Sequence, residues 1–202
     1  MFFDDGDAEC YLALLHFYAR SRDITIWAYC LMPNHVHLVM CPSTSDGMHR
    51  ALRSVHSQYA QRINRMREIT GHLWQGRYFS SPLDSAYFLN AVRYVELNPV
   101  RAGLAAKAED YAWSSARFHC GLAHSALVEQ TSMSPVLAGI SEWSAWLAKG
   151  LSSECTNTLR QHGQLNLPCG SSDYVSSLER SSGRDLKYRP RGRPAMRGED
   201  EY

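Results

Sequence analysis

The sequence contains no pair of cysteines at the short spacing that binds zinc. Its six cysteines are scattered singly along 202 residues, without a C-x-x-C pair. It also has no recognisable secretory signal peptide and no apolar run long enough to cross a membrane. These absences exclude a zinc ribbon and a membrane span, and they predict reduced thiols in a cytoplasmic protein.

Net charge is almost absent as well, because 21 basic and 20 acidic residues leave a formal charge of +1. The basic residues are nevertheless unevenly distributed. Between residues 50 and 77, six arginines accompany a single acid, Glu68. Between residues 184 and 197, six basic residues accompany a single acid, Asp185. Two basic blocks in a near-neutral chain favour contact with a polyanion, although one such block is often only a solvated surface.

Apolar residues make up 45% of the chain, which is enough for a sizeable core. Two β-branched and aromatic segments, 24–31 and 36–41, flank the turn-forming Pro33 and Asn34 and predict an antiparallel β-hairpin. Apolar residues at helical spacing predict helices at residues 8–20, 48–66, 85–97, 141–149 and 172–181. The sequence therefore predicts an α/β protein of the α+β kind, in which helices pack against an antiparallel sheet.

The most informative segment is residues 32–40 (MPNHVHLVM), in which His35 and His37 are two residues apart. Side chains of a strand alternate between its two faces, so both imidazoles should point to one face. Val36 and Leu38 should point to the other face, where a core can bury them. The two histidines are candidate metal ligands, although a His-x-His pair taken alone is more often not a site.

The helix predicted at residues 85–97 supplies a second group of candidates. Tyr94 and Asn98 are four residues apart and so share a helix face. If that face covers the histidines, a hydroxyl and an amide oxygen converge on the same metal. A nearby cation would favour the phenolate as a nucleophile and would polarise a phosphodiester. The alternative is that Tyr94 is only a half-buried aromatic residue. Pro99 disfavours helical geometry at Asn98 and predicts that the helix stops there.

Four segments in order carry a resemblance to a known family: residues 28–38 (AYCLMPNHVHL), 73–78 (LWQGRY), 94–103 (YVELNPVRAG) and 111–115 (YAWSS). They resemble the single-tyrosine HUH transposases of the IS200-like superfamily, and within it the REP-associated tyrosine transposases of bacteria. The four segments together are far more specific than any one of them. The resemblance extends over roughly residues 1–185.

The resemblance implies a ferredoxin-like core and an enzyme that cuts and rejoins single-stranded DNA at hairpin-forming, palindromic repeats. It implies that His35 and His37 hold a divalent cation, Mg²⁺ or Mn²⁺, and that Asn98 is the third protein ligand. Tyr94 would attack the scissile phosphate, form a 5′-phosphotyrosine and release a 3′-hydroxyl, so that strands can be rejoined without ATP. Two alternatives are a catalytically inactive, sequence-specific DNA-binding protein derived from such a transposase and an ordinary metal-dependent hydrolase.

Further residues are predicted to contact DNA, since arginine binds phosphate or guanine and tryptophan stacks on unpaired bases. In the core these are Trp74, Arg77 and Arg101, of which Trp74 is equally well explained as a packing residue. In the tail, the AT-hook-like run PRGRP would place Arg191 and Arg193 in a narrow minor groove. A generic basic tail that binds nucleic acid without sequence preference is the alternative.

The resemblance divides the chain into a transposase core over residues 1–120, a helical extension over 121–185 and a basic tail over 186–202. Relatives begin with one more strand ahead of Phe2, which would pair beside the strand of the two histidines. The core is therefore expected to lack its first strand, which would leave a sheet edge open. We expect a cytoplasmic, nucleoid-associated protein, either a monomer or a homodimer, with no membrane partner.

Overall fold

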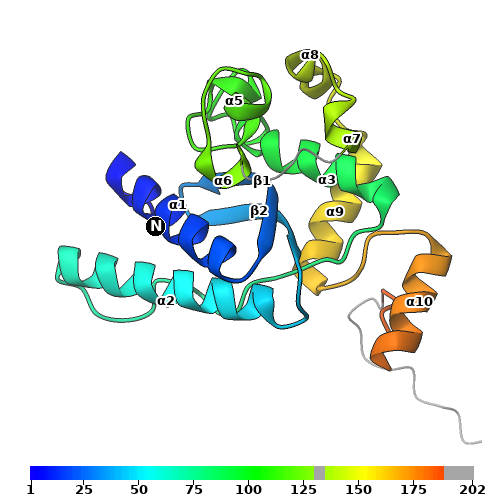
Figure 1. Cartoon of the computed structure of the whole chain (residues 1–202), viewed down its shortest axis with the longest axis horizontal. Helices are drawn as coiled ribbons and strands as arrows, with labels where there is room; N and C mark the ends of the chain where they lie inside the picture. The colour runs from blue at the N-terminus through cyan, green and yellow to red at the C-terminus, as the bar shows by residue number, and fades with distance from the viewer. Residues whose placement is uncertain (130–134, 189–202) are drawn as a thin grey trace, which may run out of the picture.

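The structure is a computed structural model, and it describes residues 1–129 and 135–188 (Figure 1). At its centre lies one antiparallel β-hairpin, made of β1 (Ile24–Met32) and β2 (His35–Pro42). Helices α1 and α2 pack on one face of this hairpin, whereas α3, α8 and α9 lie on the side of the other face. The predicted α+β class, an antiparallel sheet packed by helices, is confirmed.

The longer helices include those that the apolar spacing predicts, and α9 in addition. They are α1 (Asp5–Ser21), α2 (Gly47–Arg67), α3 (Ser85–Glu96), α8 (Trp143–Ala148), α9 (Ser153–Leu165) and α10 (Ser172–Ser182). Single helical turns connect them: α4 (Asn98–Arg101), η1 (Ala108–Asp110), α5 (Ala116–His119), α6 (Ala126–Glu129) and α7 (Pro135–Ala138).

Local sequence explains where α3 begins and ends. The carboxylate of Asp84 accepts a hydrogen bond from the backbone N–H of Tyr87, which is the usual N-cap arrangement. At the other end, the prediction of non-helical geometry at Asn98 is wrong. Asn98 begins a new helical turn, and Pro99 lies in its first turn, where a missing N–H costs no hydrogen bond.

Helix α2 places one apolar stripe against the β-hairpin and its arginines toward solvent. The stripe consists of buried side chains at helical spacing: Ala51, Leu52, Val55, Tyr59 and Ile63. Met66, the last apolar residue of the helix predicted at residues 48–66, is 55% exposed. The reason is its position in the last turn, where α2 extends past the β-hairpin (Figure 1).

Strand β1 contains one extra residue, Trp27, which forms a β-bulge between the paired Ile26 and Ala28. Before the bulge, even-numbered side chains such as Ile26 face the layer of α1 and α2. After it, the odd-numbered Tyr29 and Leu31 face that layer. The bulge therefore reverses the alternation of β1 and puts both Trp27 and Ala28 on the side of α3.

The two edges of the β-hairpin differ. Residues 113–115 cover the outer edge of β1, where the N–H of Leu31 donates to the carbonyl of Trp113 and that of Ser115 to Tyr29. Within residues 1–129 and 135–188, no strand pairs with the outer edge of β2. This open edge is the one on which the resemblance predicts a further strand.

Two smaller observations concern the cysteines and the apolar character of the helices. All six cysteines are free thiols, and Cys30 and Cys169 are buried. Among the helices that the structure describes, none is both long enough and apolar enough to cross a bilayer.

Candidate active site

Strand β2 presents its two histidines side by side. The Nε2 atoms of His35 and His37 lie 3.0 Å apart, while Val36 and Leu38 pack against the core on the opposite face. The Nδ1 atom of His35 lies 2.7 Å from the carboxamide oxygen of Asn34. Because that oxygen can only accept, Nδ1 of His35 carries the proton and its Nε2 carries the lone pair.

The surroundings of both rings disfavour their charged forms. Burial, with smaller contributions from His35 and Arg101, lowers the pKa of His37 to about 3. Burial also lowers the pKa of His35. Both rings are therefore uncharged at neutral pH, and a neutral imidazole has a nitrogen lone pair for a metal. The 3.0 Å between the two Nε2 atoms is a hydrogen-bond distance, and with the proton of His35 on Nδ1 the Nε2–H of His37 donates to Nε2 of His35. In the other tautomer of His37, both Nε2 lone pairs would be free to bind one ion.

Tyr94, from the last turn of α3, contacts His37, one of the two histidines. Its ring is perpendicular to that of His37, with 5.8 Å between the ring centroids. The guanidinium of Arg101 lies 4.1 Å from the centroid of the Tyr94 ring and donates to the Tyr94 carbonyl at 2.7 Å. Arg101 reaches this position because α4 begins immediately after α3. The fold thus brings together His35, His37, Tyr94 and Arg101.

Asn98 is the first residue of α4, two positions after α3 ends, and is only 9% exposed. Its side-chain nitrogen donates to the carbonyls of Tyr94 at 3.1 Å and Val95 at 3.3 Å. Carbonyls only accept, so the atom that faces them is the amide nitrogen, and the amide oxygen is directed away from them. The hydrogen bonds of Asn98 are therefore to the end of α3 rather than to either histidine.

The donor set for a metal is small. Within the described residues, no third His, Cys, Asp or Glu joins His35 and His37 in a cluster. Of the described residues, His35 and His37 would supply two imidazole nitrogens, and the amide oxygen of Asn98 stays the predicted third ligand. Such a set fits a divalent ion whose remaining positions are filled by water and phosphate oxygens.

A second polar cluster, which the sequence did not reveal, is buried against the same helix. Glu96 is fully buried and accepts hydrogen bonds from the Ser115 hydroxyl at 2.5 Å and the Trp143 indole at 2.7 Å. Nδ1 of His119 lies 2.6 Å from the same carboxylate. The cluster fastens α3, and hence Tyr94, to residues 115–119 and to α8. The only local signal was an acid among the apolar positions of a helix.

Two predicted DNA contacts lie on the other side of the β-hairpin, between α2 and α3 in the sequence. The Trp74 ring stacks on His56 with 4.0 Å between centroids, and its indole N–H donates to the His56 carbonyl at 3.0 Å. Arg77 is exposed. Trp74 is therefore partly a packing residue, and its role as a DNA contact stays a prediction. Arg191 and Arg193 lie outside the described residues, so the AT-hook also stays a prediction.

The family described as "Transposase IS200 like" matches residues 1–98, which include both histidines, Tyr94 and Asn98. Among solved structures, the chain is similar to that of a REP-associated tyrosine transposase bound to a REP hairpin. The two chains share 18% sequence identity with a TM-score of 0.50, over 59% of this chain and 72% of that one. At this identity the likeness shows a shared fold. No match was found among curated proteins.

Proposed function

We propose that this chain, whose residues 1–98 match the IS200-like transposase family, is a transposase that cuts and rejoins single-stranded DNA at hairpin-forming repeats. The observation that carries the proposal is the contact of Tyr94 with His37, beside the nitrogen pair of His35 and His37. A hydroxyl nucleophile next to a pair of metal ligands is what a covalent phosphotyrosine mechanism needs. The solved neighbour was bound to a REP hairpin, which supports DNA hairpins as the substrate class.

In this proposal Tyr94 is the nucleophile. Its oxygen forms a bond to phosphorus, the bond from phosphorus to the 3′ oxygen breaks, and the 3′ oxygen takes up a proton. The resulting 5′-phosphotyrosine keeps the free energy of the phosphodiester, so the 3′-hydroxyl of another strand can reverse the step. Arg101, whose guanidinium lies against the Tyr94 ring, is placed to contact a phosphate at this site.

His35 and His37 would hold the divalent cation, and the amide oxygen of Asn98 is proposed as the third protein ligand. When bound, the ion would withdraw charge from the phosphate and favour attack on it. Imidazole nitrogen is a softer donor than the oxygen ligands that Mg²⁺ prefers. Between the two expected ions, this donor set therefore favours Mn²⁺.

A covalent adduct tests the proposal. The protein, incubated with Mn²⁺ and a labelled DNA hairpin that carries a single-stranded flank, should form an adduct that survives denaturing gel electrophoresis. Tyr94→Phe should form none and should still bind the DNA. The loss of one oxygen should change the free energy of unfolding by about 1 kcal/mol or less. Tyr87→Phe, on the same helix, is the matched control and should keep the adduct.

The same assay separates the alternatives. DNA binding by the parent protein without cleavage would favour the inactive DNA-binding protein. Cleavage without an adduct, or an adduct in Tyr94→Phe, would favour a hydrolase and would reject Tyr94 as the nucleophile. Light scattering with and without the DNA hairpin distinguishes a monomer from a homodimer. The cytoplasmic, nucleoid-associated location remains part of the proposal.

A further inference from the structure

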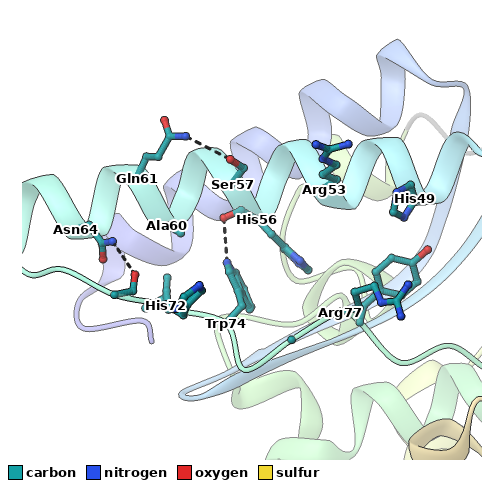
Figure 2. Close-up of a pocket in the computed structure, with 14 residues that line it drawn as sticks. His49, Arg53, His56, Ser57, Ala60, Gln61, Asn64, His72, Trp74 and Arg77 are labelled. Carbon is teal, nitrogen blue, oxygen red and sulfur yellow. Dashed lines mark hydrogen bonds between the residues drawn. The ribbon is translucent and has the colours of Figure 1, made fainter.

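A groove lies along the outer side of α2, on the face of the β-hairpin opposite the candidate active site. Its volume is about 540 Å³, within the range of roughly 300–1,000 Å³ that is usual for ligand sites. Figure 2 shows α2 on one side of the groove and residues 71–78 on the other, with Arg77 toward one end and Asn64 toward the other. Asn64 closes its end by donating to the carbonyl of Gly71 at 3.1 Å.

One wall of the groove is aromatic. The Trp74 and His56 rings stack at an angle of 25°, and the hydrogen bond from the indole to the His56 carbonyl fixes the plane of Trp74. Burial lowers the pKa of His56 to about 4, so at neutral pH this ring is an uncharged aromatic surface. Tyr78 also lines the groove. Aromatic walls of this kind bind unpaired bases by stacking.

The charge in the groove has one sign. None of its 14 lining residues is acidic, and they include Arg53 and Arg77, both exposed. Within residues 1–129 and 135–188, neither Arg53 nor Arg77 forms an ion pair, whereas Arg50 and Arg67 of α2 do. Guanidinium groups without an acidic partner beside an aromatic wall are suited to phosphates and bases together.

We propose that this groove binds an unpaired stretch of the DNA strand, with bases against the aromatic wall and phosphates at Arg53 and Arg77. This inference rests on the proposed function, since it assigns a second contact to the same DNA. An unpaired strand fits better than a duplex, because the bases of a duplex stack on one another and do not reach a concave wall. A strand bound in this groove would lie on the face of the β-hairpin opposite Tyr94, away from the phosphate that Tyr94 attacks.

Binding of two DNA probes tests this inference. One is a labelled DNA hairpin with a single-stranded flank of about ten nucleotides, and the other is the same hairpin with a blunt end. The double variant Arg53→Gln, Arg77→Gln should bind the flanked hairpin about tenfold more weakly, as expected for the loss of one or two stacked or phosphate-bound nucleotides. Its affinity for the blunt hairpin should change less than threefold, roughly. The matched control is Arg62→Gln, Arg65→Gln, two exposed arginines of the same helix outside the groove.

A second variant separates occupancy of the groove from a general effect of charge. Ala60→Phe fills the groove without changing charge, and it should also weaken binding of the flanked probe alone. Equal losses on both probes, equal losses in the control, or an unchanged Ala60→Phe variant would each overturn the inference. If the parent protein binds neither probe, the proposed function itself fails. If the groove variants bind like the parent while adducts still form, only the groove assignment fails.

Discussion

The two faces of the β-hairpin are made of the same two strands but support different chemistry. The face toward α3 holds the nitrogen pair of His35 and His37 against Tyr94, with the Glu96 cluster buried behind that helix. The face toward α1 and α2 is closed by apolar and aromatic side chains, and two arginines, Arg53 and Arg77, line the groove beside α2. Alternate residues of β2 thus differ in role: His35 and His37 belong to the candidate active site, and Val36 and Leu38 belong to the core.

The comparison shows where polar groups are tolerated in this fold. On the α3 side, both side-chain oxygens of Glu96 have hydrogen-bond partners, which offsets the cost of burying this polar group. On the α2 side, burial raises the pKa of the fully buried Tyr11 and Tyr59 and lowers that of the partly buried His56, which packs on Trp74 and remains uncharged at neutral pH. We therefore expect substitutions on the first face to affect chemistry and stability, and those on the second to affect DNA binding and the response to acid.

The largest expected effect is the loss of cleavage in His35→Ala and His37→Ala. Removing a metal ligand should lower the rate of adduct formation by at least about 100-fold, because the ion contributes several kcal/mol to the transition state. The affinity for DNA should change less than about threefold, since phosphate contacts come from arginines elsewhere. His16→Gln, on α1, is the control. Adduct formation at the parental rate in both alanine variants would show that the pair is structural, and the difference between the faces would disappear.

The second-largest effect is expected on the stability of the α3 side, from substitutions of Glu96. Glu96→Ala leaves the Ser115 hydroxyl, the Trp143 indole and His119 without their acceptor, so the free energy of unfolding should fall by about 3–5 kcal/mol. Glu96→Gln retains the shape and should cost less, roughly 1–3 kcal/mol. Urea unfolding at neutral pH measures both. A loss below about 1 kcal/mol in the alanine variant would mean that the cluster does not hold α3 in place.

On the α2 side, the expected effect appears as a response to acid. The pKa of His56 is lowered to about 4 in the folded protein, against about 6.5 in an unfolded chain. Below pH 6.5 the unfolded state therefore binds a proton that the folded state does not, and stability falls as the pH drops toward 4. At pH 5 this contribution amounts to roughly 2 kcal/mol. His56→Gln should lose less stability than the parent between pH 7 and pH 5, by about that amount. If urea unfolding shows that the parent and His56→Gln lose the same free energy of unfolding between pH 7 and pH 5, the lowered pKa of His56 is contradicted.

The smallest effect is expected from deletion of the C-terminal tail, which belongs to neither face of the β-hairpin. Deletion of residues 187–202 should weaken DNA binding by about tenfold or less at physiological salt. It should also reduce the slope of log K against log salt by roughly three to four, as about four phosphate contacts are lost. Adducts should still form at high protein concentration. A salt titration with an unchanged slope would show that the tail does not touch DNA.

What the sequence predicted correctly depends on short-range regularities. The β-hairpin, the shared face of His35 and His37 and the limits of α3 follow from alternation, turn residues and capping within a few positions. The contact of Tyr94 with His37 joins residues 57 positions apart and could be expected only through the family resemblance. Spacing alone gave no means of placing α3 over that face.

The missed features all depend on distant partners. Glu96 meets residues 19, 23 and 47 positions further along the chain, and no local pattern marks them. Helix α9 has a weak apolar pattern, because only Leu159 of its residues is buried. The direction of the Asn98 amide depends on free carbonyls at the end of α3, which exist only once the helix has formed.

Because of the β-bulge, β1 can gain or lose one residue without changing which residues of β2 it pairs with. Trp27 has no partner in β2, but its ring meets Phe88 of α3 edge-on, with 5.7 Å between centroids. If the codon for Trp27 were lost, Ile26 and Ala28 could keep both their partners and their faces, because the strand would simply alternate without interruption. The deletion would remove one aromatic contact between the sheet and the helix that carries Tyr94. An insertion at position 27 therefore adds a contact with α3 and leaves the pairing of β1 with β2 unchanged.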